Sequence, residues 1–243
     1  FKKGEMVSYA SGWGALENER RAAEGMPPIS EHLDFGTVGD EQSPWMHLLK
    51  TGYMPETCSC EAPKSYMIQD EWFEMLKKAV KGADTGNWET WMHLGLCYYW
   101  RNDFERAENC FEKSLSIKNS AWGLYCLANT MRSTARNDLA ATTMAKAAAM
   151  RPCDISLAKE ALATLNDSKD YKGIAALVEK LDPSIYIGKV KYYKAAAIAY
   201  LGDIDTAEEM LLETAVWKSL ISERERSPHL ICGYISRRKE LAA

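Results

Sequence analysis

Apolar residues recur with helical spacing between residues 91 and 119. One set, spaced i, i+3, i+4 and i+7, predicts the buried face of a first helix: Trp91, Leu94, Gly95 and Tyr98. After a polar break at 101–103, a second set spaced i, i+4 and i+7 predicts another helix: Ala107, Phe111 and Ser114. The small residues at 95 and 107 would let two antiparallel helices approach closely. The pattern therefore predicts an αα-hairpin of about 34 residues.

The turn inside this hairpin has a counterpart three more times along the chain. In each case an aspartate precedes an apolar residue, and a small or apolar residue follows three positions later. The four aspartates, separated by 35, 32 and 33 residues, are Asp103, Asp138, Asp170 and Asp203. Prolines fall where helix pairs should end, at Pro152 and Pro183. A nearly constant period of this length predicts a repeat solenoid.

The regions beside the repeats carry weaker patterns. Residues 64–81 predict a helix, with Trp72, Leu76 and Ala79 lying 35 residues before the apolar set of the second repeat helix. This helix would complete a partial first repeat. Residues 230–241 predict a last, polar helix that caps the array, and its basic cluster at 237–239 is expected to be a solvated face or, alternatively, a contact for an acidic partner.

Residues 1–62 differ from the rest of the chain. They predict a strand near 6–10, a charged helix over 17–24 and one or two helical turns around 45–49, separated by stretches rich in glycine and proline. The segment is too irregular to be a repeat and too rich in large apolar residues to be a disordered tail. We expect two parts: an irregular cap or inter-domain crossover over 1–62, and a helical repeat array with a C-terminal capping helix over 63–243.

The order of residues in the hairpin resembles the tetratricopeptide repeat. The sequence reads Trp-x2-Leu-Gly-x2-Tyr and then Ala-x3-Phe-x2-Ser, with departures at Ser114 and Asn119, where the family usually has alanine and proline. The resemblance implies an all-α fold, a solenoid of αα-hairpins with an irregular N-terminal segment. It implies no particular activity, because repeat arrays serve many functions.

Composition narrows the function classes. Of the 243 residues 47% are hydrophobic and 26% charged, and the net charge of −4 argues against general binding of nucleic acid. No apolar run is long enough to span a membrane, and no secretory signal is recognisable. Seven cysteines without framework spacing predict reduced thiols and a cytoplasmic location. A chain that starts at Phe1 without methionine is expected to be a processed or excised piece of a longer protein.

Candidate chemistry is sparse. Cys58 and Cys60, with His47 nearby, could hold a metal, but the second cysteine pair of a zinc site is absent, so a plain loop or a redox-labile pair is the simpler interpretation. Paired carboxylates in the acidic N-terminal segment could act as in glycosidases, although surface acids are far commoner. No nucleophile elbow, phosphate-binding loop or zinc-protease motif occurs. We predict no catalytic residue, metal or cofactor, and lean against enzyme activity for this chain alone.

In tetratricopeptide arrays the first helix of each hairpin lines the concave surface where ligands are met. The resemblance therefore implies a groove that is aromatic in three of its four repeats, and aromatic rings dominate binding hot spots. The candidate partner-binding residues are Met92, Leu96, Tyr99, Trp100, Trp122, Tyr125, Lys159, Tyr192 and Tyr200. The prediction is a protein-interaction scaffold that binds a peptide or partner domain. Alternatively, residues 1–62 or an adjoining domain cover these rings. Lys159 and Lys189 alone do not form the lysine and asparagine clamp with which some chaperone-binding members hold a carboxylate.

A second resemblance concerns three short segments near the N-terminus. Residues 12–17 (GWGALE), 44–49 (PWMHLL) and 52–55 (GYMP) resemble a junction in large bacterial proteins, where a galactose-mutarotase-like β-sandwich with presumed carbohydrate activity precedes tetratricopeptide repeats. It implies an alternative function as the C-terminal accessory region of a carbohydrate-active enzyme, packed against a missing catalytic domain. The partner would then be an adjoining domain or a glycan, and none of that family's catalytic residues can be placed in this chain.

Overall fold

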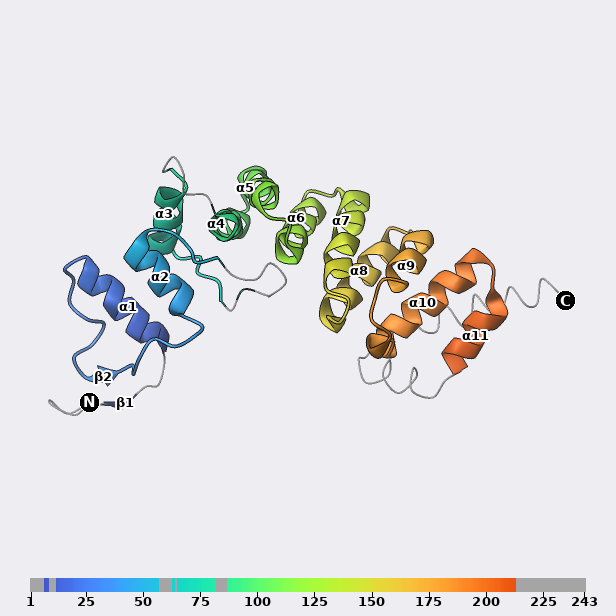
Figure 1. The fold of residues 1–243 in the computed structure, drawn as a ribbon, viewed down its shortest axis with the longest axis horizontal. Helices are drawn as coiled ribbons and strands as arrows, with labels where there is room; N and C mark the ends of the chain where they lie inside the picture. Colours follow the sequence, from blue (N-terminus) through green and yellow to red (C-terminus); the bar gives the residue numbers. More distant parts are fainter. Residues whose placement is uncertain (1–6, 9–11, 57–62, 64, 82–86, 213–243) are drawn as a thin grey trace. The chain divides into compact units, whose positions relative to one another are not determined.

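The computed structural model describes residues 7–8, 12–56, 63, 65–81 and 87–212, and the regular structure in them is almost entirely helical (Figure 1). The chain divides into two compact units, Phe1–Asn119 and Ser120–Ala243. The fold class is therefore the predicted one, all-α and built from consecutive helical hairpins. The predicted division after residue 62 stays a prediction.

Unit 1 combines an irregular N-terminal part with the predicted hairpin. Its core joins the N-terminal helices to the hairpin through large side chains, among them Leu16, Trp45, Trp72 and Leu94. Its elements are β1 Val7–Ser8, α1 Gly12–Ala23, β2 Leu33–Asp34, α2 Ser43–Thr51, α3 Asp70–Ala79, α4 Trp88–Trp100 and α5 Phe104–Ile117. The two short strands pair in parallel. The helices α3, α4 and α5 pack in chain order.

The hairpin of α4 and α5 confirms the prediction made from Gly95. A Cβ atom at this position would lie 2.5 Å from Cε1 of Phe111, so only glycine lets the two helices come this close. The Ser114 hydroxyl, where the family usually has alanine, donates a hydrogen bond of 2.6 Å to the carbonyl oxygen of Trp88. Serine in place of alanine at position 114 therefore adds a hydrogen bond between α4 and α5.

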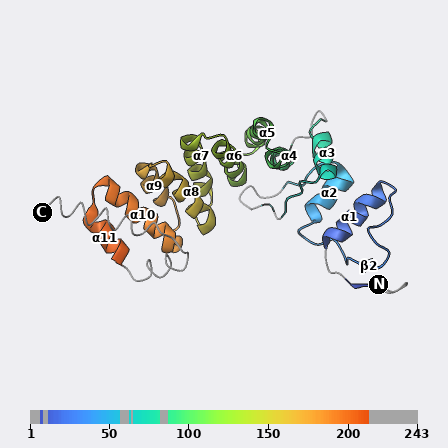
Figure 2. The same cartoon turned by 180° about the vertical axis from the view of Figure 1, so that it is seen from behind.

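Unit 2 repeats the hairpin three times with smaller side chains. Its elements are α6 Ala121–Ser133, α7 Asn137–Met150, α8 Ile155–Asp167, α9 Tyr171–Val178, the short 3-10 helix η1 Pro183–Ile185, α10 Gly188–Leu201 and α11 Ile204–Leu212. Consecutive helices pack on one another, and they lie side by side in both views (Figures 1 and 2). The second helix of the third repeat, α9, is short.

The turns inside the hairpins correct one detail of the predicted repeat. Each has a residue in the left-handed region directly before the N-cap of the second helix: Asn102, Ala135, Lys169 and Gly202. The side chains of Asp103, Asp170 and Asp203 accept hydrogen bonds from backbone N–H groups of the following helix. In the second repeat Arg136 holds the N-cap position instead. The alignment of Asp138 with the other aspartates was therefore wrong, and the true spacings of the turn are 33, 34 and 33 residues.

Two predicted helix starts were also wrong. The helix predicted over 17–24 begins at Gly12, because Gly12 and Gly14 act as packing positions and not as breakers. A Cβ on Gly14 would lie 2.1 Å from the Phe35 ring, and one on Gly12 would lie 2.3 Å from Oε1 of Gln42. The helix predicted over 64–81 begins only at Asp70, since Gln69 is extended. The apolar set predicted for this helix, Trp72, Leu76 and Ala79, is buried.

Some predictions fall on residues outside the described part of the chain. These are the Cys58 and Cys60 pair, the capping helix over 230–241 and the basic cluster at 237–239. Within the described ranges, the helices are all too short or too polar to cross a membrane.

Candidate peptide-binding surface

The predicted binding residues of unit 1 lie on α4 and differ widely in exposure. Met92 is fully buried, whereas Leu96 and Tyr99 are half-buried and Trp100 is 66% exposed. The Tyr99 ring contacts Phe104 edge-on at 5.5 Å between centroids. The part of α4 that could meet a partner is therefore its C-terminal end, where Trp100 presents most of its ring to solvent.

The predicted residues of unit 2 meet most closely on α6. Trp122 and Tyr125 lie one helical turn apart, and their rings contact edge-on at 5.4 Å between centroids. The guanidinium of Arg151 lies over the Trp122 ring at 5.3 Å and pairs with Asp154 at 3.1 Å. Both side chains are half-buried, so part of each stays accessible to solvent. The arrangement fixes two aromatic side chains at little further cost in side-chain entropy.

A polar network next to this pair joins α6 to α8. The Tyr125 hydroxyl donates to Oε2 of Glu160 at 3.1 Å, and Arg132 approaches Oε1 of the same carboxylate at 3.4 Å. Arg132 also donates to Oδ1 of Asn129 at 2.6 Å. Burial, and secondarily the Glu160 charge, raises the pKa of Tyr125, so the hydroxyl stays protonated and keeps donating at neutral pH.

The network adds Glu160 and Arg132, which the sequence analysis missed. Arg132 lies seven residues after Tyr125, on the same face of α6, so helical spacing could have suggested it. Glu160 follows the predicted Lys159 by one position on α8. Nothing in the sequence shows that its carboxylate, and not the Lys159 amine, meets the Tyr125 hydroxyl.

The last predicted residues lie on α10 and at its C-terminal end. Tyr192 is only 4% exposed and contacts Tyr193 edge-on at 5.4 Å, so its ring belongs to the core of unit 2. Tyr200 is 40% exposed and stacks on Tyr171 at 4.1 Å, with the two ring planes 10° apart. The structure therefore presents the aromatic surface of unit 2 as two separate pairs, one on α6 and one made by α9 and α10.

The side chains considered for metal binding or catalysis do not form such a site in the described part of the chain. Among the described residues no three histidine, cysteine or acidic side chains converge as metal ligands. The Glu17 carboxylate is paired with Arg20 and Arg21, at 2.7 and 2.9 Å. Asp34 accepts a hydrogen bond from the N–H of Gly36 within a local turn. Glu17 and Asp34 both belong to the acidic N-terminal segment in which glycosidase-like carboxylates were considered, and both serve structural contacts.

The cysteines in the described part of the chain are free thiols, and most of them are buried. Burial raises the pKa of Cys97 to about 11 and that of Cys110 and Cys126 to about 12, so these thiols stay protonated. Cys153 is exposed, and its sulfur lies 3.6 Å from Oδ2 of Asp182.

Helical hairpins of about 33 residues, with glycine at the first crossing and an N-cap at each inner turn, define an all-α repeat protein. A family model, the tetratricopeptide repeat, matches residues 88–120. The chain therefore contains a tetratricopeptide repeat, formed mainly by α4 and α5. A comparison with curated proteins gave no match. The resemblance of residues 12–17, 44–49 and 52–55 to a carbohydrate-active junction stays a prediction.

Proposed function

We propose that this chain is a protein-interaction scaffold that binds a peptide through the solvent-accessible part of the Trp122–Tyr125 pair. The tetratricopeptide repeat supports protein partners in general. The contact geometry of α6 supports the location, because an edge-on aromatic pair held by Arg151 and Glu160 is a rigid, partly accessible apolar surface. Such anchors supply large contact area at low entropy cost.

The single observation that carries the proposal is the network around Tyr125. Its hydroxyl is held by Glu160, and Glu160 is approached by Arg132. The network holds the hydroxyl end of a ring that is half-buried. The apolar side chains of a bound peptide would contact the rings, and the Glu160 and Arg132 charges would lie beside its backbone or polar groups.

The test begins with a peptide library displayed on phage and selected against the purified full chain. Selected peptides are then measured by isothermal titration calorimetry. Tyr125→Ala should weaken binding by roughly 30-fold, the usual effect of removing a hot spot. Tyr125→Phe keeps the ring and loses only the hydrogen bond to Glu160, so it should weaken binding much less.

The matched control is Leu139→Ala. Leu139 is also a large apolar residue, 55% exposed, but it lies on the second helix of the same hairpin. Peptides whose affinity falls equally with Leu139→Ala and Tyr125→Ala, or is unchanged by Tyr125→Ala, would contradict the proposed surface.

A further inference from the structure

A hollow of about 660 Å³ opens in unit 1, whereas the surface proposed above belongs to unit 2. It lies between α1, the extended stretch before α3 and the first turns of α3. Its aromatic lining comes from Trp13, Tyr66 and Trp72, and its polar lining includes Glu17, Gln69 and Glu71. The volume falls within the range of small-ligand sites.

The glycines around Trp13 place this ring at the hollow. Gly14 brings α1 so close to the Phe35 ring that no side chain fits there, and a Cβ on Gly12 would lie 2.3 Å from Oε1 of Gln42 and 3.2 Å from the carbonyl oxygen of Thr37. Trp13, between the two glycines, packs beside the core of unit 1 and lines the hollow. The close packing of residues 12–14 therefore fixes the Trp13 side chain at the hollow.

The α3 side of the hollow is also held in place. Trp72 is only 2% exposed and contacts Trp45 edge-on at 5.6 Å between centroids. Ser65 accepts a hydrogen bond of 2.8 Å from Nε1 of Trp45 and donates one of 2.7 Å to the carbonyl oxygen of Glu41. The aromatic walls of the hollow are thus held in place by contacts outside it.

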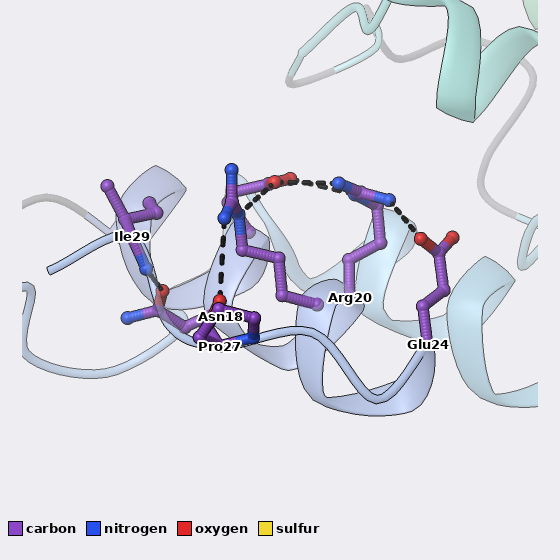
Figure 3. Close-up of polar contacts among 7 residues, drawn as sticks. Asn18, Arg20, Glu24, Pro27 and Ile29 are labelled. Carbon is purple, nitrogen blue, oxygen red and sulfur yellow. Dashed lines mark hydrogen bonds and ion pairs between the residues drawn. The ribbon is translucent and has the colours of Figure 1, made fainter.

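One of the two carboxylates is held by its own helix. Glu17 binds Arg20 and Arg21, and Arg20 also pairs with Glu24 at 2.8 Å (Figure 3). On the same helix, Asn18 accepts a hydrogen bond from the N–H of Ile29, which ties the following loop to α1 (Figure 3). Both arginines near the hollow are therefore engaged with acidic partners, and neither lines it.

Two polar side chains on the α3 side of the hollow, Gln69 and Glu71, differ from Glu17 in this respect. Gln69 occupies the N-cap position of α3 but makes no side-chain capping hydrogen bond. Glu71 is exposed in the first turn of α3 and forms no ion pair with any described residue. The described lining residues include no lysine, arginine or histidine. The hollow thus offers a carboxylate and an amide oxygen beside the partly exposed rings of Trp13 and Tyr66, all of which attract a cation with several donors.

We propose that this hollow binds the side chain of an arginine from a partner polypeptide. A guanidinium is planar and stacks on aromatic faces, while its N–H groups can reach the Glu71 carboxylate and the Gln69 amide oxygen together. A lysine ammonium is more strongly hydrated and cannot stack, so it fits this lining less well. The site would recognise a basic segment, in keeping with the net charge of −4 on the chain.

The experiment titrates the full chain, labelled with nitrogen-15, with N-acetyl-arginine-N-methylamide. The indole N–H signal of Trp13 is identified by its loss in Trp13→Phe. We expect a saturable shift of this signal, and no saturable shift with the citrulline analogue, which has nearly the same shape and no charge. Glu71→Gln should weaken arginine binding roughly tenfold, the effect of losing one charge-assisted hydrogen bond.

The matched control is Glu74→Gln. Glu74 lies on the same helix, is also exposed and pairs with Lys77 instead of lining the hollow. Equal loss of binding in Glu74→Gln and Glu71→Gln, equal binding of the citrulline or lysine analogues, or no saturable shift at all would overturn the proposal. Because the hollow lies in unit 1 and Tyr125 in unit 2, failure of one proposal leaves the other standing.

Discussion

The two units bury their helices by different means. Unit 1 fills its core with large side chains, and Trp45, Trp88 and Phe111 are among the largest fully buried residues. In unit 2 alanine is the commonest buried core residue, as at Ala161 and Ala196, which are both fully buried beside aliphatic side chains such as Leu162. Large side chains fill space between irregularly placed elements, whereas alanine lets regular helices approach to a constant distance.

The two cores should therefore be sensitive to different substitutions. A core of large side chains is most sensitive to truncation, because a cavity remains where the ring was. Buried alanines have little to lose by truncation and are most sensitive to enlargement. Unit 1 also buries a titratable group, His93, whereas the described part of unit 2 contains no histidine.

The largest effect is expected from Trp45→Ala. Trp45 is fully buried, contacts Trp72 and donates a hydrogen bond to Ser65, so the variant should lower the free energy of unfolding of unit 1 by about 3–5 kcal/mol. Hydrogen-exchange mass spectrometry in a urea series would follow the peptides of each unit. Trp100→Ala is the control, because Trp100 is 66% exposed and should change little. Equal losses in both variants would refute the assigned core.

The next largest effect is expected from lowering the pH, which should destabilise unit 1 through His93. His93 is buried against Trp45 and Tyr66, with ring centroids 5.0 and 6.0 Å away, and burial lowers its pKa from 6.5 to about 4. Between these values the unfolded chain binds a proton that the folded chain does not. Stability from the neutral imidazole is therefore complete above pH 6.5 and is lost as the pH falls toward 4, by up to about 3 kcal/mol.

Hydrogen exchange measured from pH 7 to pH 4, after correction for the intrinsic exchange rate, would test this dependence. His93→Gln removes the titrating group, so its unit 1 peptides should lose less stability over the same interval than those of the parent chain. Identical pH profiles for the parent and the variant would show that His93 does not couple to folding.

A smaller effect is expected from enlarging the core of unit 2. Ala161 on α8 is fully buried, so Ala161→Leu should cost about 1–3 kcal/mol through overpacking. Ala176→Leu makes the same change at an exposed position on α9 and should be nearly neutral. Thermal unfolding followed by circular dichroism would compare the two. A stabilised Ala161→Leu variant would mean that the core of unit 2 leaves unfilled space.

The repeat architecture could be predicted from sequence because its signal is periodic. Gly95 and Phe111 lie at family-like positions, and the structure shows the close contact that requires this glycine. The starts of α1 and α3 could not be predicted. Gly12 and Gly14 look like helix breakers until the Phe35 and Gln42 side chains that fill the space beside them are known.

The candidate sites could also be predicted only in part from the sequence. Trp122 and Tyr125 could be singled out as aromatic residues on one helix face. Glu160, the partner of Tyr125, comes from another helix 35 residues later, so only the tertiary arrangement of α6 and α8 brings its carboxylate to the Tyr125 hydroxyl. Tyr192 looked equivalent to Tyr125 by repeat position, but the structure buries its ring.

The sequence by itself determined the helical repeats, their period and the glycine at the first crossing, because hydrophobic spacing and small residues encode local structure and close helix contacts directly. The tertiary structure alone decided which aromatic side chains are accessible and which polar groups are already paired. It also revealed the hollow beside Trp13. These properties depend on residues distant in sequence, since exposure and pairing are set by whichever elements pack alongside.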